Sequence, residues 1–302
     1  MVHLQAGEIV SGLHALGTMA IPVYLWDGPE PILFDAGVSS LGPTYVRHAR
    51  HVLGSRVPTR LFLSHTHFDH CGAAAQFTQT FPGLKICASQ KAADIAVRPN
   101  AQKLMAMLNE HATELARTLA PDLAEVVPFS PFTVDEVLSD GDQLKLAGGE
   151  KLQVLASPGH TWDMLSFFLP KRGILVASEA VGCPIQDGGI ITEFLVDYDA
   201  YISSLQRLAQ LPVEVLCLAH YAALTGPDVK DYLDRALAAA KEFKEWVERL
   251  LQREGFDVAR VVQLVKQQEW DPRPQPKQPE PAYLLNLQAR VEHLAGKLSL
   301  QS

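Results

Sequence analysis

The chain has 302 residues, of which 47% are hydrophobic and 20% are charged, a balance typical of a globular protein with a substantial buried core. Its formal net charge of −8 argues against a surface that binds nucleic-acid backbones, which attract basic proteins. No stretch approaches the roughly 18 consecutive apolar residues that a membrane span needs, so we also expect no membrane association.

The first third of the chain predicts short strands and helices in alternation. Apolar runs bounded by glycine and proline predict strands, and an apolar face that ends before a glycine predicts a helix. The expected strands cover residues 21–26, 31–35, 59–63 and 84–88, and the expected helices cover residues 45–53 and 72–80.

A longer helix is predicted over residues 100–119, between two strand-rich halves. Its apolar side chains recur at nearly helical spacing and form one stripe that includes Leu104, Leu108, Ala112, Leu115 and Leu119. The segment 99–125 is therefore either a lid inserted over a substrate cleft or an ordinary helix packed on the surface.

The second half repeats the strand-rich pattern and then becomes purely helical. Strands are expected at residues 143–146, 151–155, 165–169, 173–177 and 213–218, with a helix at 199–211. Two sheet-forming halves with interspersed helices predict packed sheets flanked by helices. From residue 228 onward two apolar helical stripes flank a proline-rich connector at 271–281. We therefore expect an α/β domain at 1–225 and a helical region at 226–302.

The strongest chemical signal is an H-x-H-x-D-H run formed by His65, His67, Asp69 and His70, directly after a predicted strand. Two histidines that are two residues apart point the same way in extended backbone. Neutral imidazoles and a carboxylate suit Zn²⁺, Fe²⁺ or Mn²⁺. The alternatives are a chance cluster and an Asp69 that merely caps the following helix.

Other predicted strands also end at groups that can bind a metal. His160, Glu179 and His220 each follow a strand and are candidate ligands. Asp35 also ends a strand, and it either orients a ligand histidine or caps a turn. The four cysteines form no C-x-x-C pair, which predicts reduced, buried thiols and a cytoplasmic location. Cys71 is interpreted as such a residue rather than as a nucleophile.

Together these residues resemble the metallo-β-lactamase-fold superfamily. The resemblance implies a four-layer αββα sandwich over about residues 1–225. It implies that His65, His67 and His160 bind one metal, and that Asp69, His70 and His220 bind a second. The run from Thr66 to Gly72 and the helical C-terminal third are similar to thioesterases of the quinolone-signal-response and glyoxalase II types.

One departure from the family pattern concerns the bridging ligand. The family usually has Gly-Asp where this chain has Ser178-Glu179, and it usually has glycine where this chain has Ala219. Because glutamate is one methylene longer than aspartate, it either bridges two metals or binds only one. Two divalent ions, zinc or iron with manganese as a further option, are therefore expected, and occupancy of the second site stays open.

These expectations define a function. A metal-activated hydroxide would attack the carbonyl carbon of a small-molecule substrate, and Asp69 would accept a proton. The favoured substrate class is an acyl-CoA-like thioester. The alternatives are a lactonase, a β-lactamase or a phosphodiesterase of the same fold, and a regulatory ligand-binding protein with a degenerate metal site. A homodimer is compatible with the sequence.

Overall fold

Alternating apolar side chains give the first sheet two buried faces, as strand β4 (Ile21–Trp26) illustrates. Val23 and Leu25 enter one hydrophobic core, whereas Tyr24 and Trp26 enter another on the opposite face, because successive strand side chains point to opposite sides. The computed structural model describes residues 1–185, 188–274 and 277–300, without the side chains of residues 118–119.

The first sheet has seven strands in the order β2-β3-β4-β5-β6-β7-β8. Its neighbours are antiparallel from β2 to β5 and parallel from β5 to β8. Besides β4, the strands are β2 (Gly7–Val10), β3 (Leu13–Thr18), β5 (Ile32–Phe34), β6 (Arg60–Phe62), β7 (Lys85–Ser89) and β8 (Glu136–Leu138).

The second sheet also has seven strands, in the order β1-β16-β15-β12-β11-β10-β9. Only β12 and β15 are parallel neighbours among its described pairs. The strands are β1 (Val2–His3), β9 (Gln143–Leu146), β10 (Glu150–Ala156), β11 (Leu165–Leu169), β12 (Ile174–Val176), β15 (Val215–Cys217) and β16 (Ala223–Thr225).

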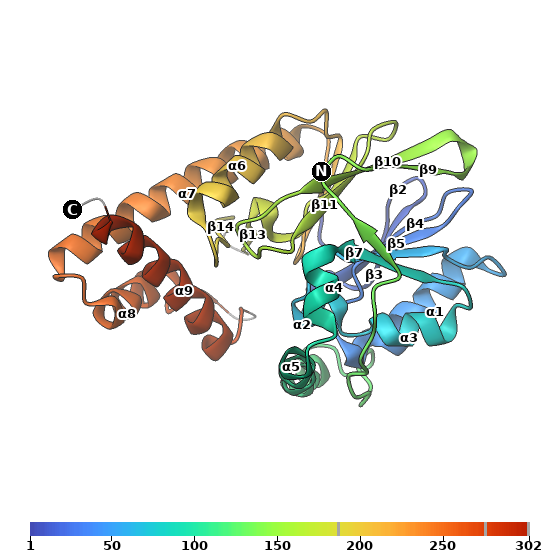
Figure 1. The fold of residues 1–302 in the computed structure, drawn as a ribbon, viewed down its shortest axis with the longest axis horizontal. Coiled ribbons are helices and arrows are strands. Elements are labelled where there is room, and N and C mark those ends of the chain that lie inside the picture. Colours follow the sequence, from blue (N-terminus) through green and yellow to red (C-terminus); the bar gives the residue numbers. More distant parts are fainter. Residues whose placement is uncertain (186–187, 275–276, 301–302) are drawn as a thin grey trace. The chain divides into compact units, whose positions relative to one another are not determined.

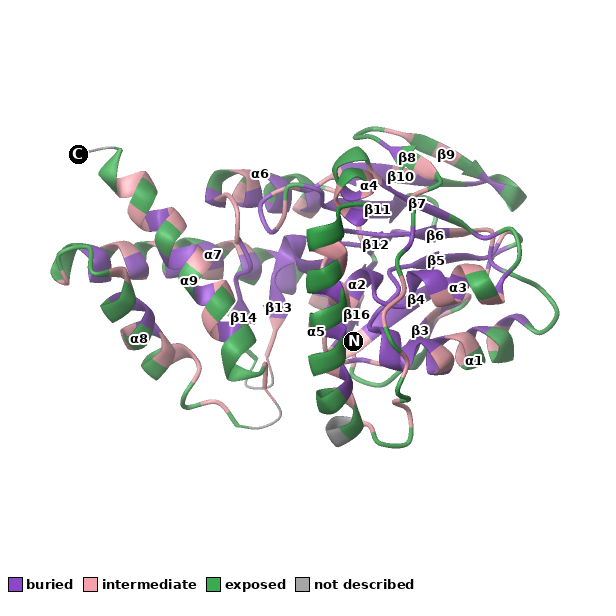
Figure 2. Ribbon diagram, turned by 60° about the horizontal axis from the view of Figure 1, so that its bottom comes forward, coloured by how far each residue is buried: buried purple, intermediate pink, exposed green. Residues whose placement is uncertain are grey.

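Aromatic side chains join the two sheets face to face. The ring of Phe167 from the second sheet lies 5.6 Å from that of Phe34 and 5.3 Å from that of Phe62, both in the first sheet. All three residues are within 1% of full burial, and Figure 2 shows the strands of both sheets mostly as buried. Burial of apolar area at about 25 cal/mol per Å² makes this inter-sheet core a main source of stability.

Helices cover the outer face of the first sheet. The core that contains Val23 and Leu25 also contains side chains of these helices. Helices α1 and α3 lie side by side against this face of the sheet (Figure 1). The helical elements of this region are η1 (Ser39–Leu41), α1 (Gly42–Leu53), α2 (Phe68–Cys71), α3 (Ala74–Thr80), α4 (Gln90–Ala96) and α5 (Pro99–Leu119). The short η2 (Ala147–Gly149) connects β9 and β10 of the second sheet.

Helix α5 is present as predicted, but it buries a different face. Leu104 is 52% exposed and Leu115 is 37% exposed, whereas Met105, Asn109 and Thr113 are buried. The cause is a polar anchor, because the Asn109 side chain accepts a hydrogen bond of 2.8 Å from the backbone of Ser39. The buried face of α5 is therefore displaced by one residue from the predicted leucine stripe. The side chain of Leu119 lies outside the described ones. The role of α5 as a lid stays a prediction.

The chain forms two compact units. The first comprises Met1–Ala156, Asp163–Ser178 and Pro212–Val229, and the second comprises Ser157–Trp162, Glu179–Leu211 and Lys230–Ser302. The domain boundary expected after residue 225 stays a prediction. The second unit holds β13 (Cys183–Pro184), β14 (Ile190–Ile191), α6 (Tyr198–Ala209), α8 (Val258–Glu269) and α9 (Glu280–Ser299). It also holds most of η3 (Ser178–Val181) and α7 (Pro227–Arg253), both of which begin in the first unit.

Helices α7, α8 and α9 confirm the predicted helical C-terminal region. The predicted apolar stripes are largely buried, as shown by Phe243 and Val247 on α7 and by Leu287 and Val291 on α9. Neither these helices nor any other described helix is both long and apolar enough to cross a bilayer. The fold class is therefore the predicted one, two mixed sheets packed on each other with helices.

Candidate metal centre

Four strand ends bring polar residues to one edge of the first unit. In the first sheet β5 leads into Asp35 and its parallel neighbour β6 leads into Ser64. In the second sheet β12 leads into Ser178 and its parallel neighbour β15 leads into His220. Parallel neighbours end on the same side of a sheet, which is where α/β proteins place their binding sites.

The H-x-H-x-D-H run turns from this edge into helix α2. The ring centre of His65 lies 4.6 Å from that of His67 and 4.3 Å from that of His70. His67 is the N-cap residue, with extended backbone, and Asp69 lies within the first turn. Asp69 therefore does not cap the helix, and its carboxylate is available for a metal.

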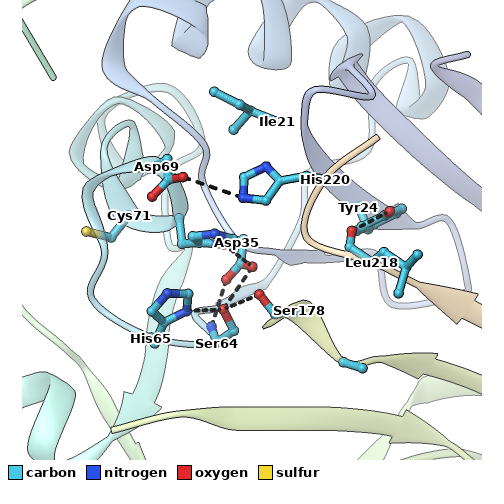
Figure 3. Close-up of polar contacts among 12 residues, drawn as sticks. Ile21, Tyr24, Asp35, Ser64, His65, Asp69, Cys71, Ser178, Leu218 and His220 are labelled. Atoms are coloured by element: carbon cyan, nitrogen blue, oxygen red, sulfur yellow. Dashed lines mark hydrogen bonds and ion pairs between the residues drawn. The ribbon is translucent and has the colours of Figure 1, made fainter. Parts of the chain in front are cut away.

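Asp69, His70 and His220 form a group whose ligand atoms all lie within 4.8 Å of one another. Nε2 of His220 lies 3.7 Å from an Asp69 carboxylate oxygen, and Figure 3 shows the two side chains facing each other. The His70 side chain is only 3% exposed, whereas those of His220 and Asp69 are 18% and 20% exposed. The group is thus closed behind His70 and open towards Asp69 and His220.

Asp35 orients this group from beneath. Its carboxylate accepts hydrogen bonds from the Ser64 backbone at 2.7 Å, from the Ser64 hydroxyl at 2.9 Å and from Nδ1 of His70 at 2.8 Å. Its backbone is left-handed, with φ of 59°, and such backbone concentrates at functional sites. Of the two interpretations of Asp35, the structure favours the one in which it orients a histidine, namely the predicted ligand His70.

These hydrogen bonds fix which ring nitrogen of each histidine can bind a metal. Nδ1 of His70 faces a carboxylate, and Nδ1 of His220 lies 2.7 Å from the Ala20 carbonyl oxygen. Both partners can only accept, so Nδ1 carries the proton and Nε2 carries the lone pair. Nδ1 of His65 lies 2.9 Å from the Ser64 hydroxyl, which itself donates to Asp35 (Figure 3). The donor set of the Asp69, His70 and His220 group, two Nε2 atoms and a carboxylate, fits a divalent transition metal.

Asp163 is a supporting residue that the sequence did not reveal. Its carboxylate accepts hydrogen bonds from the backbone and the hydroxyl of Thr66, at 2.9 and 2.8 Å. Its own carbonyl accepts one from Ser89 at 2.8 Å. Thr66 separates His65 from His67, so Asp163 fixes the backbone between two predicted ligands. An acidic residue before a buried strand was the only signal in the sequence.

Cys71 does not take part in this group. Its side chain is fully buried, and burial, with nearby Asp69 as a second cause, raises the pKa of the thiol well above its ordinary value. In Figure 3 its sulfur points away from His220. Because the nucleophilic form of cysteine is the thiolate, Cys71 is an inert buried thiol, as the sequence predicted.

His160 and Glu179 lie in the second unit. Nδ1 of His160 lies 2.7 Å from the Glu193 carbonyl oxygen, so this histidine also carries its lone pair on Nε2. The preceding Gly159 has φ of +130°, and a Cβ there would lie 2.3 Å from Cα of Tyr201. Glu179 is 4% exposed. Both residues remain predicted ligands.

We predict that Gly72→Ala destabilises the protein by about 1–3 kcal/mol, the usual cost of overpacking a filled site. A Cβ at this position would lie 2.6 Å from the Phe68 carbonyl oxygen and 2.8 Å from that of Gly37, neither of which can move freely. Unfolding in guanidinium chloride measures the effect. Gly296→Ala, in a helix with nothing within 4 Å of its Cβ, is the matched control and should not destabilise. Equal midpoints for Gly72→Ala and wild type would contradict the prediction.

Comparison with known proteins agrees with this geometry. Residues 20–220 match the family model described as the metallo-beta-lactamase superfamily. The chain is 25% identical over 252 residues to the probable metallo-hydrolase YflN of Bacillus subtilis, covering 75% of this chain and 90% of that protein. It is 26% identical over 159 residues to a hydroxyacylglutathione hydrolase of Bartonella henselae, covering 52% of this chain and 46% of that enzyme.

Solved structures show the same fold. A metallo-beta-lactamase superfamily protein from Sulfolobus tokodaii has a TM-score of 0.59 at 16% identity, covering 98% of both chains. A metallo-beta-lactamase family protein from Thermus thermophilus has a TM-score of 0.61 at 20% identity, covering 96% of this chain and 95% of its own. At these identities the likeness concerns the fold alone.

Proposed function

The chain belongs to the metallo-β-lactamase superfamily, and from this premise we propose that it is a metal-dependent hydrolase of small-molecule thioesters. The observation that carries the proposal is the group of Asp69, His70 and His220. Its histidine tautomers are fixed by Asp35 and by the Ala20 carbonyl. A protein without a metal has no need to hold two imidazoles with their lone pairs beside one carboxylate.

The thioester part of the proposal draws support from two further findings. The curated relatives include hydroxyacylglutathione hydrolases, enzymes named for a thioester substrate, although the match spans about half the length of several of them. The second finding is the helical C-terminal region (α7, α8 and α9), a feature in which the sequence resembles thioesterases of this fold. The cytoplasmic location and the zinc or iron content belong to the same proposal.

In this proposal the chain's own residues hold the metals and manage a proton. His65, His67 and His160 would hold one ion, and Asp69, His70 and His220 a second, with Glu179 between them or on one of them. When bound, such an ion supplies positive charge that acidifies a nearby water, from a pKa of about 15.7 towards about 7, and polarises a carbonyl group.

Asp69 has the further role of proton acceptor. Its carboxylate is the more exposed part of the group, at 20% against 3% for the His70 side chain. A water and a substrate carbonyl can therefore approach from the side of Asp69 and His220 but not from the side of His70. His70 is held in place by its hydrogen bond to Asp35 and keeps the group rigid while the proton moves.

The test is a substrate panel with purified protein loaded with Zn²⁺, Fe²⁺ or Mn²⁺. We expect hydrolysis of acyl-CoA or acylglutathione thioesters, lost on chelation and restored by metal. Lactones, β-lactams and bis-p-nitrophenyl phosphate serve as competing substrates. Preferential hydrolysis of one of these would support the assignment as a hydrolase and reject thioesters as its substrates. Full metal loading without turnover of any substrate would reject the enzyme in favour of a ligand-binding protein.

A further inference from the structure

Arg290 of helix α9 is a buried cation, with 0% exposure, in the second unit. Its guanidinium donates a hydrogen bond of 3.0 Å to the Thr192 carbonyl oxygen and lies 4.5 Å from the ring centre of Phe243. It also pairs with a Glu269 carboxylate oxygen at 3.3 Å. The same carboxylate accepts a hydrogen bond of 2.6 Å from the Tyr283 hydroxyl. Burying a charge in this way is costly unless its partners are fixed.

The backbone that Arg290 holds is the backbone that orients His160. Thr192 precedes Glu193, whose carbonyl oxygen lies 2.7 Å from Nδ1 of His160. Helix α9 contacts Glu193 a second time, because the Asn286 amide donates to its carboxylate at 3.4 Å. Thr192, Glu193 and His160 are 2%, 5% and 2% exposed, so this chain of contacts is shielded from water throughout.

We propose that Arg290 is a positioning residue for the predicted metal ligand His160, and that it acts through the Thr192–Glu193 backbone. The inference rests on the proposed metal-binding function and deepens it. Arg290 holds the Thr192 carbonyl, and the next carbonyl along the chain, that of Glu193, accepts the hydrogen bond from Nδ1 of His160. With the proton on Nδ1, Nε2 carries the lone pair that a metal needs. The C-terminal helical region thereby contributes to metal affinity. Groups that orient a ligand histidine typically change metal affinity by about 10- to 100-fold.

The test compares zinc dissociation constants, measured by competition with a chromophoric chelator, for wild type and Arg290→Met. Methionine keeps an apolar stem of similar length without a charge. We expect the dissociation constant of one zinc site to rise about 10- to 100-fold in protein whose near-ultraviolet circular dichroism matches wild type. The matched control is Lys297→Met on the same helix, whose ammonium pairs with exposed Asp199. That variant should bind zinc as wild type does.

A double-mutant cycle separates positioning from general structural support. If Arg290 acts through His160, Arg290→Met should have no further effect on zinc affinity in a His160→Ala background. Additive effects, or an unchanged constant for Arg290→Met alone, would overturn the inference. Arg290→Lys, which keeps one donor for the Thr192 carbonyl, should restore part of the affinity.

A second variant covers the case in which Arg290→Met fails to fold. Asn286→Leu removes the other α9 contact with Glu193, and we expect its zinc dissociation constant to rise about threefold, the usual effect of one hydrogen bond. An unchanged constant would then overturn the inference. Thioester turnover is recorded separately, so a protein that binds zinc but hydrolyses nothing would count against the proposed function and not against Arg290.

Discussion

His220→Ala is expected to lower metal-dependent hydrolysis about a thousandfold and to reduce the metal content of the chain. Nε2 of His220, a predicted ligand atom, lies 3.7 Å from an Asp69 carboxylate oxygen. Metal charge is worth several kcal/mol of transition-state stabilisation, and about 4 kcal/mol corresponds to a factor of about a thousand. The measurements are kcat/KM on the best substrate of the panel and metal per chain by plasma emission spectroscopy.

The control for this variant is a histidine outside the centre. His51 is an exposed residue on α1, and His51→Ala should keep the metal content and turnover of wild type. His220→Ala should remain folded, because its side chain is 18% exposed and its loop keeps the Tyr24 hydroxyl bond to the Leu218 carbonyl at 2.8 Å. A variant that retains full metal content and turnover would show that His220 is not a ligand.

Asp35→Asn is expected to raise the zinc dissociation constant about 10- to 100-fold, although the side chain keeps its size. The aspartate accepts three hydrogen bonds, two of them on the oxygen that faces His70. An amide nitrogen at that oxygen's position donates instead, so Nδ1 of His70 must accept. The imidazole proton then moves to Nε2, where it blocks metal binding.

Turning the amide around does not avoid the problem. The nitrogen would then face the Ser64 backbone N–H, and a buried donor left without an acceptor costs about 1–3 kcal/mol. Asp163→Asn is the matched control, because its carboxylate receives both Thr66 hydrogen bonds on one oxygen and contacts no histidine through them. We expect its zinc affinity to stay within about threefold of wild type. Equal zinc affinity for Asp35→Asn and wild type would contradict the tautomer argument.

Most elements that carry the centre could be predicted from local patterns. Strands β4, β9 and β11 have the predicted bounds. Strands β5, β6, β10 and β12 differ from prediction by one residue at each end, and β15 begins two residues later and ends one residue earlier than predicted. Their apolar side chains report burial directly, because β4, β5 and β6 lie between two hydrophobic cores and the inward side chains of the other strands enter one of them. The histidine run after β6 was visible for the same reason, since a strand end next to ligand residues is a local feature.

Features that depend on distant partners could not be predicted. The inward face of α5 follows from Asn109, which satisfies the Ser39 backbone 70 residues earlier. The role of Asp163 follows from Thr66, 97 residues away, and a lone acidic residue carries no sign of that partner. Asp35 had two local interpretations, and only its contact with His70 decided between them. Sequence periodicity reports that an element is amphipathic, and it does not report the distant partner that decides which of its residues are buried.

The hydrogen bond between Ala20 and His220 spans 200 residues, and it has a consequence for synthesis. The ribosome synthesises the H-x-H-x-D-H run long before the strand that leads to His220. The emerging chain therefore exposes these histidines before the later predicted ligands are present. Contacts this distant in sequence also form late in folding. Tight capture of metal should therefore wait until residues near 220 have joined the sheet, so the arrival of that strand, rather than the appearance of the motif, would set the moment at which the ion is acquired.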